Sequence, residues 1–225
     1  MTTLLVIAKE PRPGRVKTRL TPPFTPHQAA ALAEAALTDT LHTVARTPAH
    51  RRVLALEGDP GPWLPPGFEV VRQCAGTLDE RLAAAFAHCT GPTLLIGMDT
   101  PQVTPQLLAV DWTTCDAYFG PAEDGGFWAL GLATPDPGLL RGVPMSTPQT
   151  GAIQRARLTG LRVRDLPPLR DVDTAHDATL VAKQAPNSRF ATKLAELNAP
   201  RRVAGLHRFA APPRGAINHN EPAAK

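Results

Sequence analysis

Short apolar runs alternate along this chain with longer segments in which Leu, Val and Ala recur at helical spacing. A short, continuously apolar run is typical of a strand that is buried on both faces of a sheet. Runs of this kind predict strands at residues 4–8, 53–56, 93–97, 117–119 and 127–132, and the more mixed segments 68–71 and 161–166 are also interpreted as strands.

Capping residues between these runs mark where helices begin. Thr25 precedes Pro26 and Gln28, which is a capping box with proline in the first helical position. Thr77 and Glu80 form a second capping box. The pattern predicts helices from residue 25 through at least 44, at 77–88, from 104, at 148–158, after 174 and at 188–197.

Strands that alternate with helices predict a three-layer α/β/α sandwich around a mostly parallel sheet. We expect residues 1–198 to form this domain and residues 199–225 to be a disordered tail. Ligands bind such sheets at the carboxyl ends of the strands. The polar residues of interest follow predicted strands: Lys17, Asp99, Glu123, Asp124 and Asp173.

The composition bears on nucleic-acid binding, on metal binding by cysteine and on the cellular compartment of the protein. The net charge is +4, but no dense run of Lys and Arg with interleaved aromatic residues occurs, so nucleic-acid binding is not expected. The three cysteines lack metal-site spacing and are odd in number. Neither a signal peptide nor an apolar stretch of membrane-spanning length is present, so we expect a cytoplasmic protein without membrane contact.

The loop of residues 9–20, KEPRPGRVKTRL, combines a glycine with several cations. Gly14 would allow the backbone to approach a ligand closely. The side chains that could grip phosphate are Lys17, Arg19 and either Arg12 or Arg15. The alternative is a solvated basic loop. In either case we expect the loss of one such side chain to cost little stability.

Carboxylates follow two of the later strands. Asp99 ends the apolar run at 93–97, where it could bind Mg²⁺ or Mn²⁺ on a diphosphate, and Asp171 or Asp173 could complete the site. Two carboxylates brought close together repel one another unless a cation lies between them. The alternatives are local: Asp99 as a cap or turn residue, and a capping box at residues 174–177, which explains neither Asp171 nor Asp173.

The segment GPAEDGGFW at residues 120–128 places two acids beside two glycines, between two predicted strands. Glu123 or Asp124 could act as a general base, as a metal ligand or as an acceptor for a sugar hydroxyl. Taken alone, the Asp-Gly pair favours a simple hairpin turn.

The motifs AKEPRPGRVKTRL, GMDTP, GPAEDGGFWALG, MSTP and DVDTAHDA, in this order, resemble those of a family of small bacterial glycosyltransferase-like proteins. Some members of that family are assigned to arsenosugar biosynthesis. The resemblance covers residues 4–182 and implies the nucleotide-diphospho-sugar transferase fold, which is GT-A-type and Rossmann-like. The same architecture is similar to that of small nucleotidyltransferases such as molybdenum cofactor guanylyltransferase and phospholactate guanylyltransferase. The chain departs from the family pattern at Met98, Phe127 and Ala178, and none of these changes removes a charged site residue.

The resemblance also implies a role for each matching residue. Asp99 and Asp173 would hold Mg²⁺ or Mn²⁺, and Asp124 would catalyse together with Lys17. The nucleotide phosphates would bind Lys9, Gly14, Arg15, Lys17 and Arg19. The transferred group or acceptor would contact Glu123, Gly125, Gly126, Ser146 and Thr147.

Three functions remain open at this point. The leading one is glycosyl transfer from a nucleotide-sugar to a small-molecule acceptor, in which cations stabilise the leaving diphosphate and Asp124 deprotonates the acceptor if the reaction inverts configuration. The second is nucleotidyl transfer from a nucleoside triphosphate to a phosphorylated small molecule, with release of pyrophosphate. The third is a non-catalytic nucleotide-binding module. The sequence does not predict the nucleobase, the sugar, the acceptor or the oligomeric state.

Overall fold

A computed structural model describes residues 2–199 of the chain. The expected tail at residues 199–225 lies outside this range, apart from Ala199. The strands are β1 (Thr3–Lys9), β2 (Arg51–Glu57), β3 (Glu69–Arg72), β4 (Thr93–Ile96), β5 (Ala117–Pro121), β6 (Phe127–Leu132) and β7 (Val163–Asp165). The helices are α1 (Pro26–Arg46), α2 (Leu78–Ala87), α3 (Pro105–Leu108), α4 (Thr150–Arg157), α5 (Ala175–Gln184) and α6 (Arg189–Asn198).

These strands form one seven-stranded sheet in the order β3-β2-β1-β4-β6-β5-β7. All neighbouring pairs are parallel except those of β6, which runs antiparallel to both β4 and β5. A hairpin joins β5 to β6, and the β6 strand lies between β4 and β5. The predicted α/β architecture with a mostly parallel sheet is confirmed.

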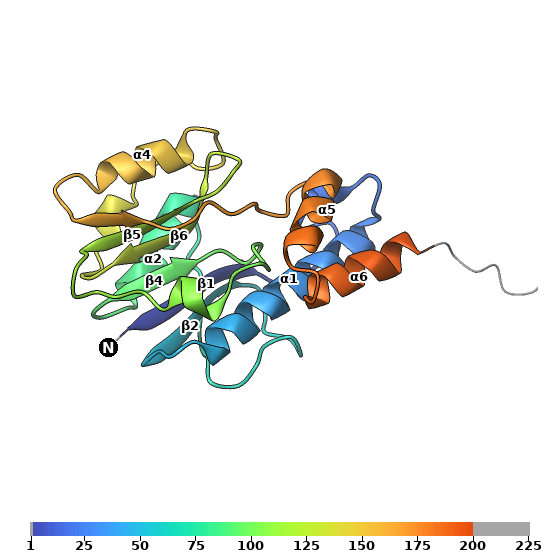
Figure 1. The fold of residues 1–225 in the computed structure, drawn as a ribbon, viewed down its shortest axis with the longest axis horizontal. Helices are drawn as coiled ribbons and strands as arrows, with labels where there is room; N and C mark the ends of the chain where they lie inside the picture. The colour runs from blue at the N-terminus through green and yellow to red at the C-terminus, as the bar shows by residue number, and fades with distance from the viewer. Residues whose placement is uncertain (1, 200–225) are drawn as a thin grey trace, which may run out of the picture.

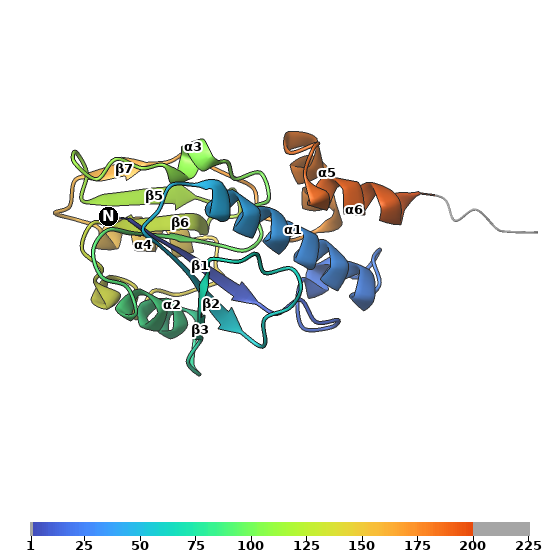
Figure 2. The same cartoon turned by 90° about the horizontal axis from the view of Figure 1, so that it is seen from below.

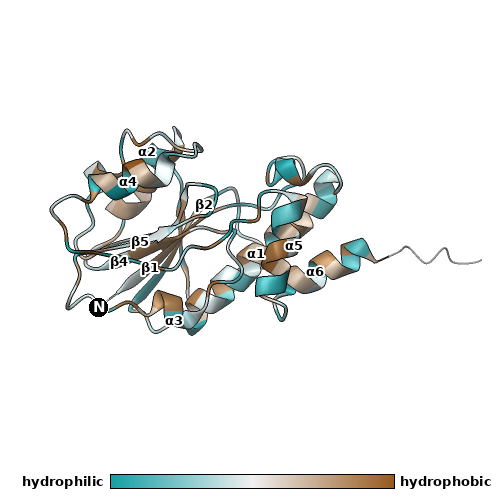
Figure 3. Ribbon diagram, turned by 45° about the horizontal axis from the view of Figure 1, so that its top comes forward, coloured by the Kyte–Doolittle hydropathy of each residue, from teal (hydrophilic) through white to brown (hydrophobic). Residues whose placement is uncertain are grey.

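Helices cover both faces of the sheet, with α2 and α4 on one side and α1 and α3 on the other (Figure 3). Successive strand residues point to opposite faces, so alternate residues of β1 enter different cores. Leu4 and Val6 pack in the core with Leu37 and Leu41 of α1. Leu5, between them, packs in the second core, which contains Leu82 and Phe86 of α2. These continuously apolar strands are therefore buried on both sides.

Helices α5 and α6 form a smaller lobe against the first half of α1, beside the end of the sheet (Figure 1). The lobe has its own core, made by Leu20, Phe24, Leu32, Val181, Phe190 and Leu194. Asp39 of α1 is buried and fixes the start of α6, because its carboxylate accepts hydrogen bonds from the backbone N–H of Arg189 at 3.1 Å and of Phe190 at 2.9 Å. The start of α5 in this lobe lines the pocket described below.

The predicted helix starts are present. Thr25 and Gln28 form the capping box of α1, and Thr77 and Glu80 form that of α2. A third capping box, of Thr174 and Asp177, opens α5. Figure 2 shows α1 running along the sheet from the lobe. Among residues 2–199, no helix is both long enough and apolar enough to cross a lipid bilayer.

Candidate functional site

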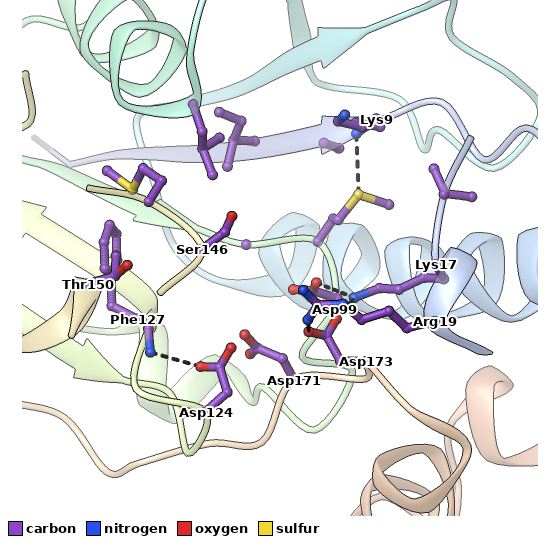
Figure 4. Close-up of a pocket in the computed structure, with 18 of the residues that line it drawn as sticks. Lys9, Lys17, Arg19, Asp99, Asp124, Phe127, Ser146, Thr150, Asp171 and Asp173 are labelled. Atoms are coloured by element: carbon purple, nitrogen blue, oxygen red, sulfur yellow. Dashed lines mark hydrogen bonds and ion pairs between the residues drawn. The ribbon is translucent and has the colours of Figure 1, made fainter. Parts of the chain in front are cut away.

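A pocket of about 750 Å³ lies at the carboxyl ends of β1 and β4, where the sheet meets the N-terminal loop and the start of α5 (Figure 4). Most of the sequence-predicted site residues line it: Lys9, Arg15, Lys17, Arg19, Asp99, Asp124, Gly126, Ser146, Thr147 and Asp173. Gly14, Glu123 and Gly125 do not line it. Side chains from five separate motifs are therefore brought into one cavity.

Backbone hydrogen bonds explain how Asp99 and Asp173 meet. Asp99 follows β4 in a loop, and its carbonyl accepts from the N–H of Val172 at 3.1 Å. Sequence reasoning placed Asp173 directly after a strand, but β7 ends at Asp165. An extended segment continues from there and bridges to the β5–β6 turn at Leu169, and this segment delivers Asp173 to the pocket.

Lys17 lies between these two carboxylates. Its Nζ is 2.5 Å from Oδ2 of Asp99 and 2.9 Å from Oδ1 of Asp173. Arg19 adds a contact on the outer side, with Nη1 3.2 Å from Oδ2 of Asp173. The cation that the closely spaced carboxylates were expected to require is thus supplied by the chain itself.

The expectation that the side chain of Lys17 is solvated is wrong. Only 11% of its side chain is exposed, against 70% for Arg19. Its backbone has φ 47° and ψ 42°, the left-handed region that non-glycine residues seldom adopt, where it opens a short 3₁₀ turn at Thr18–Leu20. Burial disfavours the charged form of Lys17, but the charges of Asp99 and Asp173 outweigh burial and raise its pKa. Lys17 is therefore a charged, structural member of the site.

Asp171 is the site residue that the sequence left least explained. It lines the pocket, and its Oδ1 is buried without a hydrogen-bond partner among residues 2–199. Burial raises the pKa of Asp171 to about 9, and the negative charge of Asp99 adds to this effect. Figure 4 shows its carboxylate between those of Asp124 and Asp173. A buried carboxylate with an open oxygen can accept a proton or a cation.

These carboxylates fit a divalent metal ion in their chemistry. Mg²⁺ and Mn²⁺ prefer carboxylate oxygens, and the open oxygen of Asp171 lies in the same cavity as Asp99 and Asp173. Within residues 2–199, however, no three His, Cys, Asp or Glu side chains are already arranged as a metal cage. The ammonium of Lys17 lies between Asp99 and Asp173 instead.

Asp124 lies in the β5–β6 turn, on the wall of the pocket opposite Lys17 and Arg19 of the N-terminal loop. The side chain of Asp124 is exposed, and its Oδ1 accepts a hydrogen bond from the N–H of Gly126 at 2.8 Å. The hairpin interpretation is therefore correct for this motif, and it does not exclude a role in the pocket. The neighbouring Glu123 pairs with Arg170, which also contacts Asp177 at 2.8 Å. Arg170 thereby ties the turn to the start of α5.

Gly125 and Gly126 serve the packing of this turn. Gly125 has φ 91°, and a Cβ atom there would come within 2.1 Å of the carbonyl oxygen of Pro148. Its own carbonyl accepts from the N–H of Gly151 at 2.7 Å. Only Gly126 of the two lines the pocket. The close contact with the start of α4 explains why glycine is needed at position 125.

The segment before α4 contributes Ser146 and Thr147, which differ in their surroundings. The hydroxyl of Thr147 is 3.3 Å from that of Thr150 and accepts from the N–H of Gln149 at 3.3 Å. Ser146 is exposed, has φ 58°, and has no hydrogen-bond partner for its hydroxyl among residues 2–199. Thr147 therefore stabilises the start of α4, while Ser146 presents its hydroxyl to the pocket.

Two polar residues that line the pocket near β3 and α2 were not identified from the sequence. Gln73 lines the pocket and donates from Nε2 to the carbonyls of Ala8 at 2.8 Å and Ala55 at 2.9 Å. Arg81 of α2 also lines it and pairs with Glu57, which lies 3.3 Å from Nζ of Lys9. Gln73 directly follows β3, so the rule that ligands bind after strands could have indicated it.

A family model described as "Uncharacterized protein conserved in bacteria (DUF2064)" matches residues 31–147, which is more than half of the chain. Among solved structures, a candidate nucleotide-diphospho-sugar transferase from Desulfovibrio desulfuricans is 27% identical, with a TM-score of 0.78 over 88% of this chain and 95% of that chain. No curated protein matches the chain.

Two further solved structures share the fold at lower identity. One is Rv0371c from Mycobacterium tuberculosis in complex with manganese, which is 20% identical, with a TM-score of 0.50 over 81% of this chain and 97% of that one. The other is 2-C-methyl-D-erythritol 4-phosphate cytidylyltransferase from Thermus thermophilus, which is 17% identical, with a TM-score of 0.50 over 83% of this chain and all of that one. At these identities the likeness concerns the fold alone.

Proposed function

The chain belongs to the DUF2064 family, and from this premise we propose that it is a metal-dependent transferase that acts on a nucleotide-activated substrate. Its favoured reaction is glycosyl transfer from a nucleotide-sugar to a small-molecule acceptor. The observation that carries the proposal is one pocket at the carboxyl ends of the strands, with a cationic loop on one wall and Asp124 on the other. The name of the Desulfovibrio structure, a candidate nucleotide-diphospho-sugar transferase, agrees with it.

The N-terminal loop is the proposed site for the nucleotide phosphates. Arg15 is exposed, lines the pocket and has no ion-pair partner among residues 2–199. Arg19 keeps most of its side chain in solvent and touches only one carboxylate. Arg15, and the exposed part of the Arg19 guanidinium, can therefore bind a diphosphate and stabilise the charge that develops on it as it leaves. Arg12 of the same loop pairs instead with Glu10, at 2.7 Å, and does not line the pocket.

Asp124 is the proposed general base on the acceptor side. An exposed carboxylate on the wall opposite the cations can accept the proton of an acceptor hydroxyl as that oxygen attacks the sugar. The hydrogen bond from Gly126 holds the carboxylate in place. The hydroxyl of Ser146, from the loop before α4, lines the pocket and would orient the transferred group.

Asp99 and Asp173, with Asp171 beside them, are the residues that would hold the metal ion. When bound, a divalent ion supplies positive charge for the leaving diphosphate. The carboxylates themselves form the floor of the pocket between the cationic loop and Asp124 (Figure 4).

Nucleotidyl transfer is the second candidate, and the number of cations favours it. Arg15, Lys17 and Arg19 all line the pocket from one short loop, and a triphosphate offers more oxygens and negative charge to such a set than a diphosphate does. A nucleoside triphosphate would use the whole set, and a phosphorylated substrate would then displace pyrophosphate.

Product analysis distinguishes these reactions. The purified chain is incubated with Mn²⁺, a panel of radiolabelled nucleotide-sugars and nucleoside triphosphates, and a small-molecule extract as acceptor. Glycosyl transfer releases a nucleoside diphosphate, and nucleotidyl transfer releases pyrophosphate. Nucleotide binding with neither product would show a binding module instead.

Asp124→Asn is the matched variant for this assay. The amide keeps an oxygen that can accept from Gly126, so the turn should stay folded, but it cannot take up a proton. We expect turnover to fall by about 100-fold or more while nucleotide affinity is unchanged. Full turnover in this variant would remove Asp124 from the reaction.

A further inference from the structure

The ammonium of Lys17 occupies the space that a divalent ion would need. It lies 2.5 Å from Oδ2 of Asp99 and 2.9 Å from Oδ1 of Asp173. A metal ion held jointly by Asp99 and Asp173 would have to enter the space that this ammonium fills. Two cations cannot share this position, because like charges a few ångströms apart repel strongly inside a protein.

We propose that Lys17 is an exchangeable counterion: it neutralises Asp99 and Asp173 in the metal-free protein, and a divalent ion binds by displacing its ammonium into the pocket. The displaced ammonium is then available to a phosphate group of the substrate. This inference rests on the proposed function, because both the metal ion and the phosphate belong to that proposal.

The proposed movement involves the side chain of Lys17 alone. The backbone of Lys17 is held by the 3₁₀ turn, in which its carbonyl accepts from the N–H of Leu20 at 3.0 Å. The side chain is a flexible four-carbon stem that carries a compact charge, so it can change rotamer while its α-carbon stays fixed. The cavity into which it would move is the pocket that Lys17 already lines.

Arg19 shows why the role belongs to Lys17. Arg19 contacts only Asp173, on the other oxygen of that carboxylate, and 70% of its side chain is exposed. It therefore lies outside the space between Asp99 and Asp173. A metal ion could bind there without displacing Arg19, although the nearby positive charge would weaken binding slightly.

The exchange makes metal binding and phosphate binding support each other. Breaking the ion pairs of Lys17 with two carboxylates costs free energy. The interaction of the displaced ammonium with a phosphate offsets part of that cost. By thermodynamic linkage, the factor by which bound phosphate raises the affinity for the metal ion equals the factor by which bound metal raises the affinity for phosphate. Lys17 is thus a positioning residue that couples the two ligands.

The test compares Mn²⁺ binding to the full chain and to two variants in the absence of nucleotide, by titration calorimetry. Lys17→Met keeps the apolar stem and removes the competing charge, so its Mn²⁺ dissociation constant should fall about fivefold or more relative to wild type. Arg19→Met removes one charge from the same cluster and should change the constant by about twofold at most. Equal or weaker Mn²⁺ binding by Lys17→Met would overturn the exchange.

A second measurement uses the wild type and does not depend on how Lys17→Met folds. A crystal structure with Mn²⁺ should show the metal on Asp99 and Asp173, with Nζ of Lys17 beyond hydrogen-bond distance of both. A bound Mn²⁺ with Nζ still between the carboxylates would refute the proposal. Such a result would leave the transferase proposal intact, because that proposal is tested separately by nucleotide binding and product formation.

Discussion

The residue that changes most between sequence and structure is Lys17. From the sequence it is one of several cations in a loop that is predicted to bind phosphate or, alternatively, to be simply solvated. In the structure it is buried between Asp99 and Asp173, which lie 82 and 156 residues further along the chain. The local sequence pattern around Lys17 cannot predict these ion pairs, because they depend on how β4 and the segment before α5 pack in the folded protein. The carboxylates themselves could be predicted, since each follows a strand or a strand-like segment.

Removing Lys17 should destabilise the protein, whereas removing Arg19 should not. Lys17→Met leaves two neighbouring carboxylates without their counterion, so the free energy of unfolding should fall by about 1–3 kcal/mol, less than for a fully buried pair because solvent reaches both carboxylates. Arg19→Met should cost about 0–1 kcal/mol. Urea denaturation in a chelator measures both values, and equal losses in the two variants would contradict the structural role of Lys17.

Gly125 and Gly14 provide a second contrast at the residue scale. Both have positive φ, but a Cβ on Gly125 would meet the carbonyl of Pro148, while one on Gly14 would meet nothing within 4 Å. Gly14→Ala should therefore lower the free energy of unfolding by only about 1–2 kcal/mol, which is the cost for a residue with a Cβ atom to adopt positive φ. Gly125→Ala should lower the free energy of unfolding further, because backbone atoms must shift. Similar melting temperatures for the two variants would show that the contact with Pro148 is not tight.

At the scale of elements, the sequence predicted the helix starts and the strands well, because capping boxes and apolar runs are local signals. It did not predict that β6 lies between β4 and β5. That order follows from hairpin pairing together with the antiparallel ladder between β4 and β6, which joins residues far apart in the chain. It also gave no sign of the lobe formed by α5, α6 and the first half of α1.

The contact between Asp39 and the start of α6 should hold this lobe together. Asp39→Ala leaves the amides of Arg189 and Phe190 without their acceptor, so the free energy of unfolding should fall by about 1–3 kcal/mol. Asp39→Asn keeps one acceptor oxygen and should lose less. Hydrogen exchange at the first turn of α6 measures the local effect. Unchanged protection in Asp39→Ala would mean that the apolar core alone fixes the helix.

At the scale of the whole molecule, the proposed ligands should stabilise the fold. Both bind between segments from distant parts of the chain, and a ligand that binds only the folded state at about 100 times its dissociation constant adds about 2.7 kcal/mol. Mn²⁺ with a bound nucleotide should therefore raise the melting temperature more than Mn²⁺ alone. Excess chelator should reverse the metal-dependent part and abolish turnover. A melting temperature that is indifferent to Mn²⁺ and chelator would argue against a metal ion in the pocket.

The central claim is that the N-terminal loop binds nucleotide phosphates in the pocket, and two arginines of that loop allow a direct test. Arg15 lines the pocket, whereas Arg12, three residues earlier, is held by Glu10 outside it. Titration calorimetry with a panel of nucleoside diphosphates and Mn²⁺ should identify one that binds the wild type. Its affinity should fall about tenfold or more in Arg15→Ala, because a charge-assisted hydrogen bond contributes about 1.5–3 kcal/mol, and it should be unchanged in Arg12→Ala. Equal affinities in both variants, or no binding by the wild type, would contradict the account.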